Sequence, residues 1–206
     1  MQFTQRFLWV LYNVFLALVP VALAYFFSWL AGAKFPFRKP AMVIVGLVWI
    51  VFVPNTCYLI TEWRHFLETL GYTNLPSTWQ WDMDSRILLM GLTLFYVCYS
   101  GAGVFAFALS VRPMVRLLKN WELRPWLWGI PFFILVSMGV YLGLIHRFNS
   151  WNILDQFGTI WATVLELGHR PELFSFIVLF AGVLWLVYLF ADIWIDGFVH
   201  RFKKRG

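Results

Sequence analysis

Residues 41–61 read AMVIVGLVWIVFVPNTCYLIT and contain no charged side chain. About 20 helical residues cross the ~30 Å of hydrocarbon in a bilayer, so this stretch is long enough to span a membrane as a helix. Pro54 lacks the backbone N–H that a continuous helix uses, and it therefore predicts a kink within the segment. We expect a membrane span that is interrupted near its middle.

Four more stretches share this length and this lack of charge. They are Phe7–Leu30, Ile87–Val111, Trp126–Ile145 and Leu173–Ala191, the last continued as a helix to about residue 195. In lipid only helices and closed barrels satisfy every backbone group, and the alternating pattern of barrel strands does not occur in the sequence. We therefore predict an all-α, polytopic transmembrane helical bundle of about five spans, forming a single integral-membrane domain over residues 1–206.

The overall composition supports this class. The chain is 61% hydrophobic and 13% charged, whereas soluble domains are roughly 45–50% apolar and about 25% charged. This composition excludes a cytosolic enzyme, a disordered tail and a nucleic-acid-binding module. The net charge of +6 is interpreted as a sign of membrane topology rather than of an acidic partner.

The positive charges are unequally divided between the two sides of the predicted bundle. Five of the 16 Lys and Arg residues fall on the side of the N-terminus, and the other 11 fall on the side of the C-terminus. Because positive charge marks the cytoplasmic side, we expect a multi-pass protein of a bacterial plasma (inner) membrane with its N-terminus outside. On the inner side, Asp192 and Asp196 are expected to pair with the basic segment 112–125 or with the C-terminal tail.

Residues 150–167 follow an amphipathic helical pattern, with apolar side chains on one face and polar side chains on the other. Asn149 or Ser150 is suited to cap this helix. The pattern predicts an interfacial helix on the outer leaflet. A lid or lateral gate over a site in the membrane is the alternative. Most tryptophans fall near the ends of spans, as in an aromatic belt.

Polar side chains gather at the outer ends of several spans. Asn55, Tyr58 and Glu62 share one helical face, flanked by His65, and Asn13 of the first span reaches the same depth as Asn55. Since bare polar groups are costly in hydrocarbon, these side chains should face the bundle. Thr93 and Ser137 reach similar depths. Hydrogen-bonding between helices is the structural alternative for Asn13, Asn55, Thr93 and Ser137.

The fourth span ends close to this layer. Gly139 and Gly143 form a small-xxx-small pair that permits close helix packing. We assign candidate acid–base roles to Glu62 and His65, and candidate substrate-binding roles to Asn13, Asn55, Tyr58, Asp82, His146, Arg147 and Asn149. An interfacial ion pair of Arg147 with Glu62 or Asp82 is the alternative. Glu62 and His65 form an E-x-x-H pair, which occurs once in the sequence, whereas helical bundles that hold two metal ions need this pair twice. We therefore predict no metal site. We also predict no cofactor.

Three strings, YNVFLALVP (12–20), PNTCYLITE (54–62) and YLGLIHRFNSW (141–151), resemble a family of bacterial membrane proteins, the domain of unknown function 1361. The likeness covers roughly residues 7–200 and implies a small multi-span protein, but it implies no particular activity. The third string more often reads G-R-x-x-R-x-N-S-W in the family. Here Leu144 replaces its first Arg, while Arg147 matches its second.

Three kinds of function remain open. The first is binding or modification of a lipid, lipid-linked or amphiphilic substrate at an outward-facing polar site. The second is a transporter or channel subunit, because broken helices often flank substrate sites. The third is a non-catalytic subunit or assembly factor that docks laterally in the membrane. The expected partners are membrane lipids and a second copy or another membrane protein, without nucleic acid.

Overall fold

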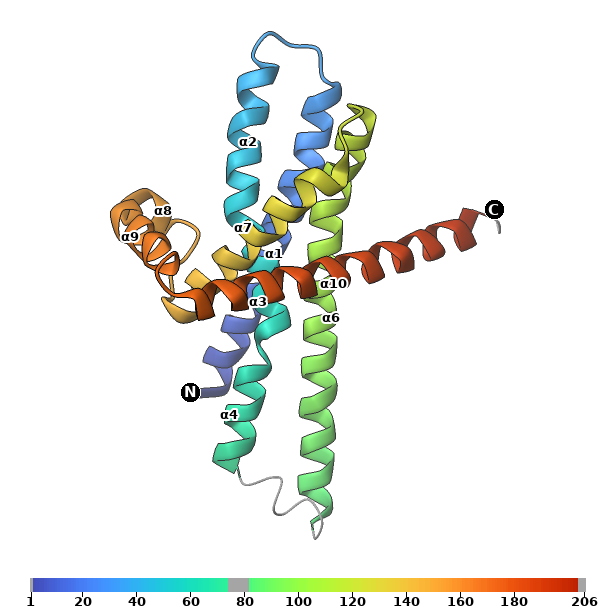
Figure 1. The fold of residues 1–206 in the computed structure, drawn as a ribbon. Coiled ribbons are helices and arrows are strands. Elements are labelled where there is room, and N and C mark those ends of the chain that lie inside the picture. Colours follow the sequence, from blue (N-terminus) through green and yellow to red (C-terminus); the bar gives the residue numbers. More distant parts are fainter. Residues whose placement is uncertain (1, 74–81, 204–206) are drawn as a thin grey trace.

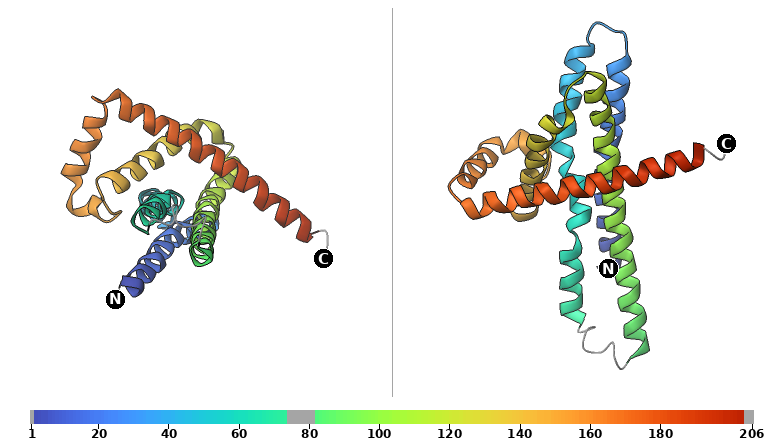
Figure 2. Two further views of the ribbon diagram at one scale, coloured as in Figure 1. Left: turned by 90° about the horizontal axis from the view of Figure 1, so that it is seen from below. Right: turned by 45° about the vertical axis from the view of Figure 1, so that its right-hand side comes forward.

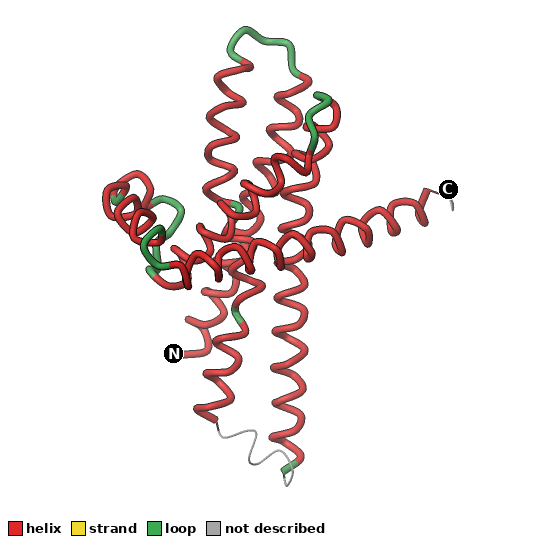
Figure 3. Tube along the Cα trace, viewed as in Figure 1, coloured by secondary structure: helices red, strands yellow, loops and turns green. Residues whose placement is uncertain are grey.

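A computed structural model describes residues 2–73 and 82–203 (Figure 1). Apart from short connections these residues are helical, and they contain no strand (Figure 3). The predicted all-α class is confirmed. The helices are α1 (Gln2–Gly32), α2 (Arg38–Phe52), α3 (Pro54–Thr61), α4 (Trp63–Thr73), α6 (Met83–Asn120), α7 (Pro125–Ile145), α8 (Asn152–Asp155), α9 (Phe157–Leu167) and α10 (Pro171–Lys203).

Five helical segments are long and apolar enough to cross a membrane: Leu8–Gly32, Arg38–Gly71, Met83–Asn120, Leu127–Ile145 and Pro171–Phe202. They correspond to the five predicted spans, and the chain is a multi-pass membrane protein. Several helices run beyond the uncharged stretches. Residues 112–120, which lie beyond the predicted third span Ile87–Val111, continue α6, because leucine, arginine and lysine all favour a helix outside the hydrocarbon as well.

The regular helical hydrogen bonding of the second span is interrupted at Val53 and at Glu62, although both residues keep right-handed helical backbone angles. The first interruption directly precedes Pro54, which begins α3 and lacks the N–H that would continue the helical hydrogen bonds. The short helix α3 contacts α1, α6 and α7. Most of its side chains are buried, among them Pro54, Asn55, Thr56, Cys57 and Leu59. The string PNTCYLIT therefore lies at the packing centre of the protein.

The spans are not all aligned. Helices α1, α2 and α6 extend along the long direction of the molecule, while α10 crosses them steeply in both upright views (Figures 1 and 2). Helix α7 packs against α10. Helices α8 and α9 lie at the end of α10 opposite the C-terminus (Figure 2).

Glycines allow the close approach of α3 to its neighbours. A Cβ atom on Gly139 of α7 would lie 2.6 Å from Pro54 Cγ, and one on Gly103 of α6 would lie 2.7 Å from Leu59 Cβ. A Cβ atom on Gly143 would overlap the Tyr58 hydroxyl. The close helix packing predicted from Gly139 and Gly143 is confirmed.

The predicted helix over residues 150–167 differs from the observed structure. The chain instead forms a single turn, α8, and a separate helix, α9, interrupted at Gln156, whose φ of −122° and ψ of 25° are not helical. Neither helix has a side-chain N-cap. The expected cap by Ser150 is wrong because this side chain points to the second span, as described below.

Candidate functional site

Ser150 connects the loop after α7 to the break between α2 and α3. Its hydroxyl donates a hydrogen bond to the backbone carbonyl of Val51 at 3.1 Å and accepts one from Asn55 Nδ2 at 3.0 Å. Pro54 interrupts the hydrogen-bond ladder at this point, and Ser150 supplies a donor to one carbonyl beside the gap. Asn55 is only 3% exposed, so its amide depends on this partner.

Tyr58 and Glu62 occupy the same helical face as Asn55, but each engages a different element. The Tyr58 hydroxyl donates to the Gly139 carbonyl of α7 at 3.4 Å. Glu62 instead faces α1, where Asn13 Nδ2 donates to its carboxylate at 3.4 Å. Asn13 thus supplies a partner to this face, but to Glu62 and not to Asn55, whose depth it was expected to share. The shared face therefore joins three helices rather than lining one cavity.

Around Glu62 the structure forms a polar group that we call the Glu62 cluster, consisting of Asn13, Glu62, His65 and Tyr99. The His65 Nε2 atom lies 3.6 Å from the Glu62 carboxylate, and its Nδ1 atom lies 3.0 Å from Glu68. Tyr99 of α6 is 7% exposed and sits beside Asn13 and Glu62. The two candidate acid–base residues, Glu62 and His65, are thus adjacent.

Of the other two polar residues assigned to this layer, one connects helices and one does not. Ser137 of α7 donates to the Ile177 carbonyl of α10 at 2.8 Å. Thr93 of α6 donates to the Leu89 carbonyl of its own helix at 2.8 Å. The interhelical alternative therefore applies to Ser137, whereas Thr93 satisfies its hydroxyl locally.

Asp82 has a local role as the N-cap of α6. Its carboxylate accepts hydrogen bonds from the Ser85 hydroxyl at 2.6 Å, from the Ser85 backbone N–H at 3.1 Å and from the Asp84 backbone N–H at 3.3 Å. The hydrogen bonds from Ser85 favour the charged form and lower the pKa of the Asp82 carboxyl. Asp82 is not paired with Arg147.

His146 lies in a small cavity of about 150 Å³ between the end of α7, α9 and the start of α10. We call it the loop pocket. Its walls combine charged, hydroxyl-bearing and apolar side chains: Tyr141, His146, Thr163, Glu166, Leu167, Arg170 and Leu173. His146 Nε2 lies 3.3 Å from the Tyr141 hydroxyl, and Arg170 forms an ion pair of 2.5 Å with Glu166.

The sequence interpretation did not assign Thr163, Glu166 or Arg170 to a site. These residues follow an i, i+3, i+7 spacing, the same spacing that drew attention to Asn55, Tyr58 and Glu62. A polar stripe at this spacing beside an amphipathic helix could have identified them. Their position opposite His146 depends on the fold and could not be read from the spacing.

Arg147 and Asn149 lie outside these clusters. Arg147 is exposed and has a left-handed backbone with φ of 56°. In the described part of the chain it forms no ion pair, so the alternative of an ion pair with Glu62 or Asp82 is not found there. Asn149 contributes its backbone N–H, which donates to Asn152 Oδ1 at 2.8 Å. Both residues turn the chain between His146 and Ser150.

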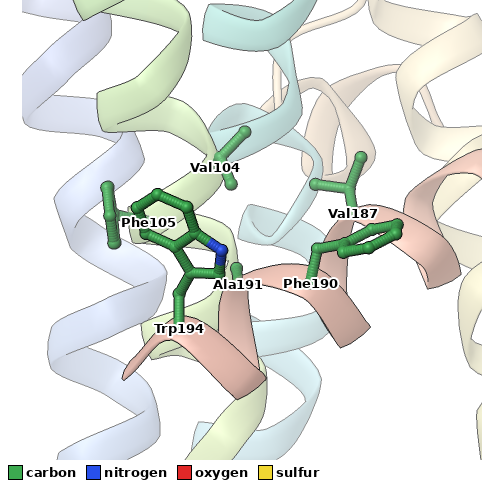
Figure 4. Close-up of a pocket in the computed structure, with 6 residues that line it drawn as sticks. All are labelled: Val104, Phe105, Val187, Phe190, Ala191 and Trp194. Carbon is green, nitrogen blue, oxygen red and sulfur yellow. The ribbon is translucent and has the colours of Figure 1, made fainter. Parts of the chain in front are cut away.

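A second charged group joins α6 to α10. Arg112 is 6% exposed; its Nε atom lies 3.1 Å from Asp192, and its guanidinium also pairs with Asp196. This confirms the predicted pairing of the two aspartates with segment 112–125. The same two helices line an apolar groove of about 310 Å³ without acid–base groups (Figure 4), formed by Val104, Phe105, Val187, Phe190, Ala191 and Trp194.

No group of three or more His, Cys, Asp or Glu side chains that could hold a metal ion occurs within residues 2–73 and 82–203. A family model described as "Protein of unknown function (DUF1361)" matches residues 12–187. This range includes all three strings that carried the resemblance. No curated protein and no solved structure matches the chain.

Proposed function

We propose that this chain, which belongs to the DUF1361 family of proteins of unknown function, binds the polar head of an amphiphilic molecule in the loop pocket. The observation that supports this function is the composition of the pocket. A guanidinium, an imidazole, a carboxylate and hydroxyl groups surround a cavity of about 150 Å³, next to apolar side chains and to two membrane-spanning helices. Such a mixture suits a ligand with a charged end and an apolar end.

Arg170 is the candidate anchor for an anionic group. Its side chain is 62% exposed and its guanidinium is paired with Glu166. The guanidinium can therefore meet a phosphate or carboxylate, which arginine binds through two parallel hydrogen bonds. Glu166 then faces a hydroxyl or amine of the same ligand. His146, placed against Tyr141, is the candidate group for proton transfer.

The apolar part of the ligand would lie along α9. Phe157, Trp161 and Leu165 are all more than half exposed and lie four residues apart, which places them on one face of the helix. The rings of Phe157 and Trp161 stack. In this proposal α9 lies in the membrane interface, as an amphipathic helix with aromatic residues does.

The direct test is the binding of a phosphate-bearing lipid to the purified protein in nanodiscs, measured by native mass spectrometry. Since a hydrogen bond to a charged group contributes about 1.5–3 kcal/mol, Arg170→Gln should weaken binding at least about tenfold. Arg201→Gln, at an exposed position on α10, is the matched control. Equal binding by both variants would exclude the loop pocket as the binding site.

We also propose that the N-terminus lies outside a bacterial plasma membrane and the C-terminus inside. The unequal distribution of Lys and Arg supports this orientation. Trp121 and Trp151 are exposed and lie on opposite predicted sides. In a Cys98→Ala background, a membrane-impermeant maleimide should label Trp151→Cys and not Trp121→Cys in intact cells. The reverse pattern would overturn the orientation.

A second candidate function is that of a transporter or channel subunit. The double break in the second span favours it, because interrupted helices flank solute sites in many transporters. Flux of a solute through proteoliposomes that contain only this protein, abolished by Glu62→Gln and retained in Arg170→Gln, would select this function over the first.

A further inference from the structure

The loop pocket contains a pair of opposite charges. The Glu166 carboxylate of α9 and the Arg170 guanidinium form an ion pair of 2.5 Å. Among the described residues that line the pocket, they are the only carboxylate and the only guanidinium. Both side chains are more than half exposed, at 57% and 62%. Each charge is therefore balanced by the other, and both can be reached by a ligand.

Binding of an anionic group to Arg170 has a cost at Glu166. A phosphate that accepts two parallel hydrogen bonds from the guanidinium competes with Glu166 for the same donors. The carboxylate then loses its cation and has a like charge beside it, and like charges at this separation repel. A ligand that carries a positive charge close to its phosphate removes this cost, because it gives Glu166 a new partner.

The groups around Glu166 suit a primary ammonium. Thr163 lies one helical turn before Glu166, and its hydroxyl donates to the Thr159 carbonyl at 2.9 Å. The Thr163 oxygen is therefore left as an acceptor beside the carboxylate, and a primary ammonium has three N–H donors for these two acceptors. A quaternary ammonium has no donor and is typically held in a cage of aromatic rings, whereas the described walls offer only the rings of Tyr141 and His146.

The pocket also limits the distance between the two charges of the ligand. Glu166 and Arg170 are in direct contact, so a ligand that touches both needs its charges only a few atoms apart. Leu167 is buried and belongs to an apolar cluster with Tyr141 and Leu173, all of which line the pocket. A short link of methylene groups between phosphate and ammonium would be covered by these apolar side chains.

We propose that the loop pocket selects a phosphoethanolamine head, whose phosphodiester binds Arg170 and whose primary ammonium binds Glu166 and Thr163. The ligand thereby replaces one ion pair within the protein by two ion pairs with itself. This inference rests on the proposed function, the binding of an amphiphile in this pocket. It adds that the head is a zwitterion with N–H donors.

The test compares three phospholipids that have the same acyl chains and carry a phosphoethanolamine, phosphocholine or phosphoglycerol head. Their binding to the full-length protein in detergent is measured by native mass spectrometry. The phosphoethanolamine lipid should bind about fivefold more tightly than the other two, the upper range for an ion pair that stays partly exposed. Equal binding of all three lipids, weakened in Arg170→Gln, would overturn the choice of head and leave the proposed function standing. Binding that does not depend on Arg170 would overturn both.

Glu166→Gln is the decisive variant, because it keeps the size of the side chain and removes its charge. It should abolish the preference for the phosphoethanolamine lipid over the phosphoglycerol lipid while the latter still binds. Glu172→Gln, at an exposed position that does not line the pocket, should keep the preference. A charge on His146 would act in both proteins and would cancel from this ratio. An unchanged preference in Glu166→Gln would contradict the inference.

Soluble phosphoethanolamine distinguishes a lipid from a water-soluble ligand. It carries the same charges without acyl chains, which should add buried apolar area along α9. We therefore expect it to displace the phosphoethanolamine lipid only at concentrations at least about tenfold higher than the lipid itself requires. Equally strong competition would overturn the lipid as the source of the head.

Discussion

Asn55 donates a hydrogen bond to Ser150 across 95 positions of sequence, at a distance of 3.0 Å. The same Ser150 hydroxyl donates to the Val51 carbonyl at 3.1 Å. These contacts join the strings PNTCYLITE and YLGLIHRFNSW, two of the three that carry the family resemblance. The two strings therefore form one structural unit, in which a loop completes a broken helix.

Ser150→Ala removes this connection and leaves a buried amide and a backbone carbonyl without their partner. We expect a loss of about 1–3 kcal/mol in the free energy of unfolding, the usual penalty for an unsatisfied buried polar group. The measurement is chemical denaturation in detergent. Asn149→Ala, one residue away at an exposed position, should change stability by less than about 0.5 kcal/mol. Equal effects of the two substitutions would contradict the role given to Ser150.

Gly139→Ala tests the close contact between α7 and α3. The added Cβ atom would lie 2.6 Å from Pro54 Cγ, a ring that cannot rotate away, so we expect destabilisation of about 1–3 kcal/mol. In the same helix, a Cβ atom on Gly129 meets nothing closer than 3.9 Å. Gly129→Ala should therefore be neutral or stabilising. Thermal unfolding of both variants provides the comparison, and a neutral Gly139→Ala would show that the helices can separate at little cost.

Arg147 adopts a left-handed backbone conformation with φ of 56°, which costs a residue with a side chain roughly 1–2 kcal/mol. Arg147→Gly should keep or raise thermal stability, while Arg147→Val should lower it. Such strain at an exposed polar residue often accompanies a functional role. Lipid binding measured on the same Arg147→Gly sample separates the two roles, because a loss of binding without a loss of stability would assign the side chain to the ligand.

Among residues 2–73 and 82–203, Arg112 is the only cation that pairs with Asp192 and Asp196. Arg112→Gln leaves two neighbouring carboxylates without a cation, and we expect a loss of about 1–3 kcal/mol because both carboxylates remain partly exposed to solvent. Asp192→Asn in the same chain should restore part of this loss by removing one of the charges. Arg201→Gln, at an exposed site on α10, serves as the control. If Arg112→Gln unfolds at the same denaturant midpoint as the wild type, the ion pairs contribute little to the free energy of unfolding.

The cap on α6 should depend on pH. The pKa of Asp82 is lowered in the folded chain by its hydrogen bonds with Ser85, so the cap stabilises the helix above the usual Asp pKa of about 3.9. This contribution is lost as the pH falls through the lower, folded-state pKa. Amide exchange in the first turn of α6 should rise at that pH in the wild type. Asp82→Ala, which removes the cap, should show faster exchange at neutral pH, without the transition at low pH.

The spans could be predicted because hydrocarbon requires long stretches without charge, and residues 41–61 met this requirement clearly. The ends of the helices could not be predicted, because a helix need not end where the chain leaves the hydrocarbon. Helix α6, for example, continues to Asn120 through residues that favour helix. The steep crossing of α10 (Figure 2) depends on packing against α7 and α6, which no pattern within α10 expresses.

The candidate residues were predictable only where simple helical geometry placed them together. Equal depth in two spans matched Asn13 with Asn55. In the folded chain Asn13 instead donates to Glu62, and Asn55 donates to Ser150. The role of Ser150 could not be found in this way, because a serine before a helical pattern is ordinarily a cap, and only the folded chain shows that it faces the second span instead. Arg170 was likewise recognisable as a charge, but its position in a cavity with His146 arises from the turn between α9 and α10.

The dependence of Val51 on Ser150 has a consequence for biogenesis. A nascent chain that ends before residue 150 contains the complete second span but not the donor for this carbonyl. In lipid an unpaired backbone group is costly, so the second span should stay incompletely packed, or be held by the insertion machinery, until the fourth span and the loop behind it have been synthesised. Assembly of this protein would then be a late event, governed by the arrival of one serine rather than by the insertion of each helix in turn.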